Sequence, residues 1–290
     1  MGTRGSDLAR IQTEYALSLL AKSGIEEGME AQTVRTSGDR NNAANPAEGS
    51  FVDSINLRII DGSLDMGVHS MKDLPAQLPS ELEIAAIPKR ASRHDCTVGP
   101  AMLFRLPSGA AVGTSSPRRI AQLMRFRPDL RAVQLRGNVT KRISAVSAGK
   151  VNAAILALAG LERLNFSPSG GMGIYPLPLD HFVPAAGQGA LAVVCRKGYL
   201  TQDVKRRATD RTTAGEVDIE RRLLFELSAG CNKPLGISAV SFGRGYTIRL
   251  QLLSADGTKE AKLTAGVAAD SSIADLISSF ARIRMSRFGE

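Results

Sequence analysis

The sequence predicts an α/β protein with two lobes around a cleft, followed by a smaller α+β domain. Three observations predict it: strand and helix patterns alternate in two successive regions, polar side chains follow the ends of the expected strands, and the pattern changes beyond Asp210. The chain has 290 residues, of which 43% are hydrophobic and 22% charged. Such a composition is typical of a globular protein, and the length allows two or three domains.

The first alternating region predicts lobe one. A helix is expected over residues 7–20, because apolar side chains recur at helical spacing after Ser6, a favourable N-cap residue. The other expected elements are strands over 30–34, 64–69 and 82–87 and a helix over 51–60. The motif Met71-Lys72-Asp73-Leu74-Pro75 follows the strand 64–69 directly. Residues 88–94 are expected to cross between domains.

The second alternating region predicts lobe two. A strand over 110–113 runs into Thr114-Ser115-Ser116-Pro117, where a hydroxyl N-cap and a proline at the first helical position open a helix. The later expected elements are strands over 131–135 and 153–158, a turn over 136–138 and a helix over 139–148. This alternation predicts largely parallel sheets, which bind ligands at the carboxyl ends of their strands.

The C-terminal region predicts the α+β domain. Thr213 and Glu216 have the spacing of a capping box before a helix that ends near Cys231. Strands are expected over 237–242, 247–253 and 261–267, and a last helix over 273–284.

Charge and composition narrow the possible partners. The net charge of +9 predicts attraction to nucleic acid, an acidic surface or a polycarboxylate. Only 4% of the residues are aromatic, which argues against nucleic acid. The longest nearly apolar run, 151–161, is shorter than the roughly 20 residues of a membrane span. Arg4, Asp7 and Arg10 interrupt the apolar stretch that a signal peptide needs, so we expect a cytoplasmic protein with no membrane partner.

Charged side chains at strand ends and helix starts are the first candidate site residues. Guanidinium groups bind carboxylates through paired hydrogen bonds, so the arginines of lobe two predict a site for a ligand with several carboxylates. Asp73 could form an ion pair with Lys72, cap a turn, or stabilise a cation in the cleft. The arginines in question are Arg118, Arg119, Arg136, Arg142 and Arg163.

The three cysteines lack the spacing of a disulfide framework or a zinc site. Cys195 lies in an apolar run, as buried and inert cysteines do, whereas Cys231 is expected in a polar loop where Lys233 would favour the thiolate. The histidines have no metal-binding spacing, so no metal is expected; we expect His69 to be a satisfied core or second-shell group.

Seven sequence motifs resemble those of the porphobilinogen deaminase family, in the same order and spacing over almost the whole chain. They begin at Gly2-Thr3-Arg4-Gly5-Ser6, Val68-His69-Ser70-Met71-Lys72-Asp73, Val112-Gly113-Thr114-Ser115-Ser116-Pro117-Arg118-Arg119, Leu135-Arg136-Gly137-Asn138, Leu158-Ala159-Gly160-Leu161-Glu162-Arg163, Pro184-Ala185-Ala186-Gly187-Gln188-Gly189 and Ala229-Gly230-Cys231.

The resemblance implies a transferase with two lobes like those of periplasmic binding proteins and a small α+β domain. The domains would be 1–90 with 184–208, 91–183, and 209–290. The family joins four porphobilinogen molecules head to tail, losing ammonia each time, on a dipyrromethane cofactor held by a thioether, and releases hydroxymethylbilane. Cys231 matches the attachment cysteine. We expect a monomer.

The resemblance also assigns roles to individual residues. Asp73 would be catalytic, stabilising the azafulvene cation that forms when porphobilinogen loses ammonia. The residues expected to bind the cofactor are Lys72, Ser115, Arg118, Arg119, Arg136 and Arg142. Those expected to bind substrate are Arg4, Ser6, Thr114, Arg163 and Gln188.

The chain departs from the family pattern at three places. Met1 directly precedes Gly2, so we expect either that the first strand of lobe one is missing or that the start is truncated. The loop 39–50 is short, and Asn232 and Lys233 replace small or apolar residues. Two alternatives stay open at this point: a two-lobed binding protein for an anionic ligand, and an enzyme-like paralogue that holds the primer but turns over poorly.

Overall fold

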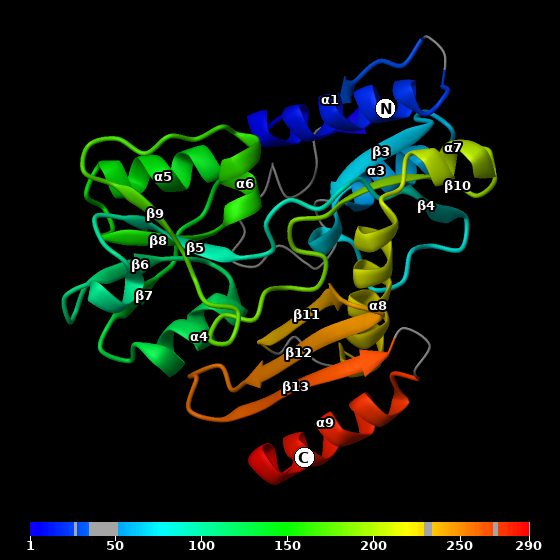
Figure 1. The fold of residues 1–290 in the computed structure, drawn as a ribbon. Coiled ribbons are helices and arrows are strands. Elements are labelled where there is room, and N and C mark those ends of the chain that lie inside the picture. The colour runs from blue at the N-terminus through cyan, green and yellow to red at the C-terminus, as the bar shows by residue number, and fades with distance from the viewer. Residues whose placement is uncertain (26–27, 35–51, 229–233, 269–271, 290) are drawn as a thin grey trace. The chain divides into compact units, whose positions relative to one another are not determined.

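The computed structural model describes residues 1–25, 28–34, 52–228, 234–268 and 272–289, without the side chain of Ser228. Contacts within the chain define two compact units, Met1–Ala91 with Gly189–Gly215 and Ser92–Gln188 with Glu216–Glu290. The described residues form three separate sheets, one in the first unit and two in the second (Figure 1). The predicted division into three domains stays a prediction.

The first unit is built on a mixed sheet with the strand order β2-β1-β3-β10-β4. β1 pairs in parallel with β2 and β3, whereas β10 runs antiparallel to both β3 and β4. The strands are β1 (Gly2–Thr3), β2 (Gln32–Thr33), β3 (Met66–Ser70), β4 (Leu82–Ala86) and β10 (Leu191–Arg196), and the helices are α1 (Asp7–Lys22), α3 (Asp53–Ile60) and α7 (Gln202–Arg207).

The expectation that lobe one lacks its first strand is wrong. Gly2 and Thr3 themselves form β1, between β2 and β3. Glycine fits closely at both Gly2 and Gly67. A Cβ at Gly67 would lie 2.5 Å from Ile55 of α3 and one at Gly2 would lie 2.6 Å from Leu64, so a larger residue would displace these side chains. The predicted cap of α1 is confirmed, since the Ser6 hydroxyl accepts a hydrogen bond from the Ala9 amide.

The first sheet of the second unit has the order β7-β6-β8-β5-β9. Both of its faces are covered, because successive residues of β8 pack into different clusters: Ala153 and Ile155 into one, Ala154 and Leu156 into the other. The strands are β5 (Asp95–Gly99), β6 (Ala111–Gly113), β7 (Arg131–Val133), β8 (Ala153–Ala157) and β9 (Gly173–Pro176), and the helices are α4 (Pro117–Phe126), α5 (Val139–Ser147) and α6 (Leu158–Arg163).

The second sheet of this unit is an antiparallel meander of β11 (Leu235–Phe242), β12 (Gly245–Leu253) and β13 (Glu260–Ala268). α9 (Ala274–Phe288) lies along it, and its residues Leu276 and Phe280 enter the core of the sheet (Figure 1). All four of these elements confirm the predicted ones to within a few residues.

The predicted start of α8 (Arg211–Ser228) is wrong, whereas the predicted start of α4 is confirmed in position. α8 begins before Thr213, and its first turn is capped by Asp210, whose Oδ1 accepts from the Thr213 amide at 2.8 Å. At the start of α4, Ser116 is the N-cap residue and Pro117 follows it, but the Ser116 side chain makes no capping hydrogen bond. The Thr114 hydroxyl accepts from the Ser116 amide at 3.3 Å instead.

The expectation of largely parallel sheets holds only for part of each lobe. β5 and β10 both run antiparallel to their neighbours, and the sequence pattern predicted neither β5 nor β9. The antiparallel direction of β5 and β10 matters for the site. Each of these strands begins at the edge of its sheet where the parallel strands end. None of the helices in the described ranges has both the length and the apolar content of a membrane span.

Candidate active site

In the first unit, one edge of the sheet gathers several of the predicted site residues. Gly2 pairs in parallel with Gly67, so Arg4 and Ser6, which follow β1, lie at the edge where β3 also ends. Lys72 and Asp73 follow β3 at this edge in a single turn of 3₁₀ helix, Met71–Asp73. The Met71 amide fixes that turn by donating to the Ala190 carbonyl at 3.0 Å.

Asp73 is an exposed carboxylate that the fold does not use. In the described part of the chain it makes no hydrogen bond or ion pair, although Lys72 is its neighbour. The 3₁₀ turn is closed by backbone atoms alone, from the Leu74 amide to the Met71 carbonyl. Neither a structural ion pair nor a turn cap therefore accounts for Asp73.

His69 of β3 is buried beside this edge and differs from the prediction of a satisfied core group. Its Nε2 atom is buried without a hydrogen-bond partner in the described residues. Burial, with a smaller contribution from the nearby positive charge of Arg4, lowers the pKa of His69 to about 4. The imidazole is therefore neutral near pH 7.

In the second unit, the equivalent edge is organised by Asp95, which the sequence analysis did not identify. β6 and β8 are parallel and end at this edge, while antiparallel β5 begins there, with Asp95 paired to Ala157 at the end of β8. The first turn of α4 brings Arg118 and Arg119 to Asp95. The sequence feature that could have identified Asp95 is its position directly before the buried run Cys96 to Val98.

Asp95 is fully buried and accepts hydrogen bonds on both oxygens. Oδ2 accepts from Arg118 Nη1 at 2.7 Å, and Oδ1 accepts from Arg119 Nη2 at 2.6 Å and from Gln188 Nε2 at 2.9 Å. Burial opposes the ionisation of Asp95, but the two guanidinium groups outweigh it and hold its pKa well below the usual value. Asp95 is therefore a charged structural group.

The two adjacent arginines use their nitrogens differently. Arg119 donates hydrogen bonds from Nε and Nη2 to Asp95 and from Nη1 to the Ile155 carbonyl. Its Nη2 also donates a longer hydrogen bond to Gln188. Arg118 makes all its hydrogen bonds from Nη1. Its Nε and Nη2 find no acceptor among the described residues, so the paired donors that suit a carboxylate are open on Arg118 and occupied on Arg119.

Arg142 adds a second open guanidinium to this edge. It projects from α5, whose start is capped by Asn138, and its Nε donates to the Gly137 carbonyl at 2.9 Å. Gly137 has a φ of +100°, and the turn places Arg136 immediately before it on the exposed surface. The Nη atoms of Arg142 have no partner within the described ranges, and burial together with the charge of Arg119 lowers its pKa.

The remaining predicted site residues serve the fold as well. The Ser115 hydroxyl donates to the Leu135 carbonyl at 2.8 Å, and the Gln188 amide, fully buried, donates to Asp95 and to the Arg93 carbonyl. Arg163 is the half-buried last residue of α6. The binding roles predicted for these residues stay predictions.

The cysteines fall into two groups. Cys96 and Cys195 are completely buried, and burial raises their pKa to about 12 and about 11, so both thiols stay protonated. The inert role predicted for Cys195 agrees with this burial. Cys231 follows α8 in the chain and precedes β11, and it lies outside the described residues.

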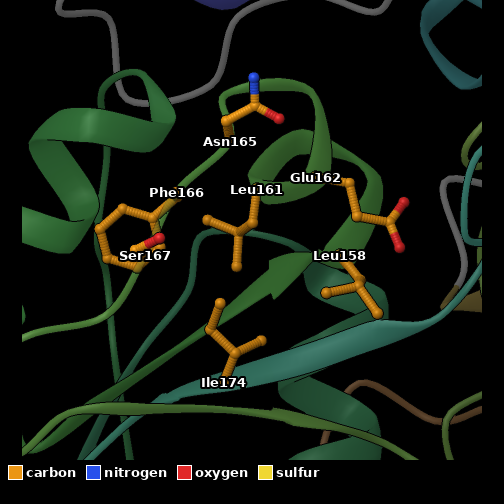
Figure 2. A pocket seen from close by; sticks show the side chains of 7 residues that line it. All are labelled: Leu158, Leu161, Glu162, Asn165, Phe166, Ser167 and Ile174. Carbon is orange, nitrogen blue, oxygen red and sulfur yellow. The ribbon is translucent and has the colours of Figure 1, made fainter.

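A shallow pocket of about 460 Å³ lies beside α6 in the second unit (Figure 2). Glu162 is on its rim, and one of its oxygens accepts from the Ser92 amide at 3.0 Å. None of the predicted site residues lines this pocket; its lining is Leu158, Leu161, Glu162, Asn165, Phe166, Ser167 and Ile174.

The fold and the arginines define a mixed α/β protein with open cationic donors at one edge of a sheet. A family model described as "Porphobilinogen deaminase, dipyromethane cofactor binding domain" matches residues 1–203. A porphobilinogen deaminase of Rubrobacter xylanophilus is 39% identical over 264 residues, covering 89% of this chain and 85% of the relative. One of Deinococcus deserti is 38% identical over 276 residues, covering 91% and 88%. The chain belongs to the porphobilinogen deaminase family.

Two solved structures of periplasmic domains resemble the chain distantly. A periplasmic VFT2 domain of BvgS from Bordetella pertussis is 17% identical, with a TM-score of 0.41 over 68% of this chain and 74% of that domain. A TRAP periplasmic solute binding protein from Ralstonia eutropha is 14% identical, with a TM-score of 0.39 over 79% and 80%.

Proposed function

We propose that this chain is a working porphobilinogen deaminase. It condenses four porphobilinogen molecules head to tail with loss of ammonia, on a dipyrromethane primer bound to Cys231, and releases linear hydroxymethylbilane by hydrolysis. Membership of the family supports this reaction. The structural observation that supports it in this chain is that Arg118 and Arg142 have open hydrogen-bond donors. The monomeric state and the cytoplasmic location stay predictions.

The residues of the second unit fit a primer that carries acetate and propionate groups. Arg118, Arg119 and Arg142 bring three guanidinium groups to one edge, where Asp95, among the described residues, pairs with Arg118 and Arg119 only. The excess positive charge is partly buried, which favours a bound anion because charges interact more strongly away from water. Arg118 and Arg142 would each hold a carboxylate, and the exposed Arg136 would hold another. Lys72, in the first unit, is a further proposed cofactor ligand.

Asp73 has the properties that the cation-forming step needs. When porphobilinogen loses ammonia, its remaining azafulvene carries positive charge on the pyrrole nitrogen. A carboxylate about 4 Å away stabilises such a charge by about 4 kcal/mol at the effective dielectric near a protein surface. That corresponds to roughly a thousandfold in rate. Because Asp73 has no partner in the described residues, its full charge is available to the substrate.

Each condensation is balanced without a redox partner. The carbon–nitrogen bond of the aminomethyl group breaks and ammonia leaves; one carbon–carbon bond forms, and a ring proton is lost. The bound primer supplies the nucleophilic pyrrole carbon. Arg4 and Ser6, at the same edge as Asp73, would hold the carboxylates of the incoming substrate. Thr114 and Gln188 are fully buried, so we do not place them in contact with the substrate.

The test is turnover by purified protein and by two cysteine variants. Wild-type protein should consume porphobilinogen and form a linear tetrapyrrole, and Cys231→Ser should fold but fail to do so. Cys195→Ala is the control, because its thiol is buried and protonated and takes no part in the reaction. A wild-type chain that binds porphobilinogen without consuming it would instead be an anion-binding protein.

A further inference from the structure

Gln122 of α4 is a fully buried amide whose hydrogen-bonding groups are all used. Its Oε1 accepts from Arg118 Nη1 at 2.9 Å. Its Nε2 donates to the Val183 carbonyl at 2.8 Å and to Gln251 Oε1 at 2.7 Å. Gln122 lies one helical turn after Arg118, so both side chains leave α4 on the same face.

The Val183 carbonyl joins this amide to the beginning of β11. It accepts from both Arg118 Nη1, at 2.9 Å, and Gln122. Gly236 of β11 packs directly against it, because a Cβ there would lie 2.5 Å from the Val183 oxygen. The next residue, Ile237, donates its amide to the Pro184 carbonyl at 2.8 Å. One peptide segment therefore contacts both the arginine and the strand that follows the Cys231 segment in sequence.

We propose that Gln122 is a positioning residue that fixes the Arg118 guanidinium for the growing pyrrole chain. Arg118 is held at Nη1 by Asp95, Gln122 and Val183, and this leaves its Nε and Nη2 as an oriented pair of donors. The guanidinium lies at the end of a long side chain, so fewer anchors would let that pair rotate away from a bound carboxylate. This inference rests on the proposed function.

A purely structural role for Gln122 is the alternative, and Gln251 of β12 provides the matched control. Gln251 is also fully buried, and its Nε2 donates to the His181 carbonyl at 3.1 Å and to Glu260 at 2.9 Å. It contacts Gln122 but, within the described ranges, not Arg118. Removing either amide takes one buried hydrogen bond from the other, so both substitutions should lower the melting temperature.

The experiment compares Gln122→Met with Gln251→Met in the full-length enzyme. Methionine keeps an unbranched side chain of similar length without the amide. We expect Gln122→Met to lower kcat at least about tenfold, since small misplacements of a binding group can cost more than that. The KM for porphobilinogen should change little, because Arg118 holds the growing chain rather than the incoming substrate. Gln251→Met should retain kcat at a comparable melting temperature.

Two further measurements make the outcome decisive. Intact-protein mass of Gln122→Met with limiting porphobilinogen should show partly extended chains, which a loss of stability alone does not produce. If that variant does not fold, Gln122→Glu keeps an acceptor for Arg118 and should retain kcat despite a lower melting temperature. Equal kcat values for the two methionine variants, or a Gln122→Glu variant that folds without turnover, would overturn the inference. Absence of turnover in wild type would instead reject the proposed function.

Discussion

Asp73 and Asp95 lie at the ligand edges of two different sheets, and the fold treats their carboxylates in opposite ways. Asp73 is exposed and has no partner in the described residues, whereas Asp95 is fully buried and bonded to Arg118, Arg119 and Gln188. The comparison teaches that position at a strand end does not define a catalytic carboxylate. A carboxylate is available for catalysis only where no ion pair within the fold already uses its charge.

The same contrast holds for the cations beside them. Asp95 occupies the paired donors of Arg119 and only one nitrogen of Arg118. The buried ion pair thereby fixes two arginines while leaving one pair of donors open to a ligand. In the first unit, the buried titratable group is His69, and Asp73 is exposed to solvent.

Replacing Asp95 should have the largest effect on stability. Asp95→Asn removes the charge between two buried guanidinium groups, and breaking a buried pair typically costs about 3–5 kcal/mol. The folded pKa of Asp95 lies below its unfolded value of about 3.9, so its contribution is present above that pH and is lost as the pH falls below it. Urea unfolding of both proteins at pH 7 and pH 3 tests this; equal stability at pH 7 would contradict it.

Replacing Asp73 should lower turnover and spare the fold. Asp73→Asn removes the charge expected to stabilise the azafulvene cation, so kcat should fall roughly a thousandfold. Asp73→Glu keeps the charge but displaces it, and a small residual activity is expected. The check is kcat at matched melting temperatures. Near-native turnover by the Asn variant, or its failure to fold, would show that Asp73 is not the catalytic carboxylate.

His69 should make the first unit sensitive to mild acid. Its folded pKa of about 4 lies below the unfolded value of about 6.5. The unfolded chain therefore takes up the proton first, and the free energy of unfolding should fall by about 3 kcal/mol between pH 6.5 and pH 4. His69→Leu should flatten that dependence, whereas the exposed His181, replaced by Gln, serves as the control. Identical pH profiles for wild type and His69→Leu would disprove the account.

Arg142 should contribute less than either aspartate. Arg142→Leu removes open donors from a partly buried cation, and losing one side of such a charge pair costs about 2 kcal/mol or more, which is roughly thirtyfold in turnover. Arg206→Leu is the matched control, since Arg206 is exposed and pairs only locally with Asp203 among the described residues. Unchanged turnover in the Arg142 variant would remove it from the site.

Local sequence signals predicted much of the fold and pointed to Asp73 as a candidate site residue, but not to Asp95. Ser6 caps its helix as expected, because a cap depends on neighbours three residues away. Asp73 was found for a similar reason, since it directly follows a buried strand. Asp95 was missed because its partners lie far off in the chain: Arg118 is 23 residues later and Gln188 is 93. No local pattern contains such pairings.

The intact mass of the freshly purified wild-type chain tests the central claim most directly. The account predicts a covalent addition of two pyrrole units that maps to the peptide containing Cys231. With limiting porphobilinogen, the mass should rise in steps of one ring, up to four, and then return to the starting value as product is released. A chain whose mass equals that of its sequence and does not change with porphobilinogen would contradict the account.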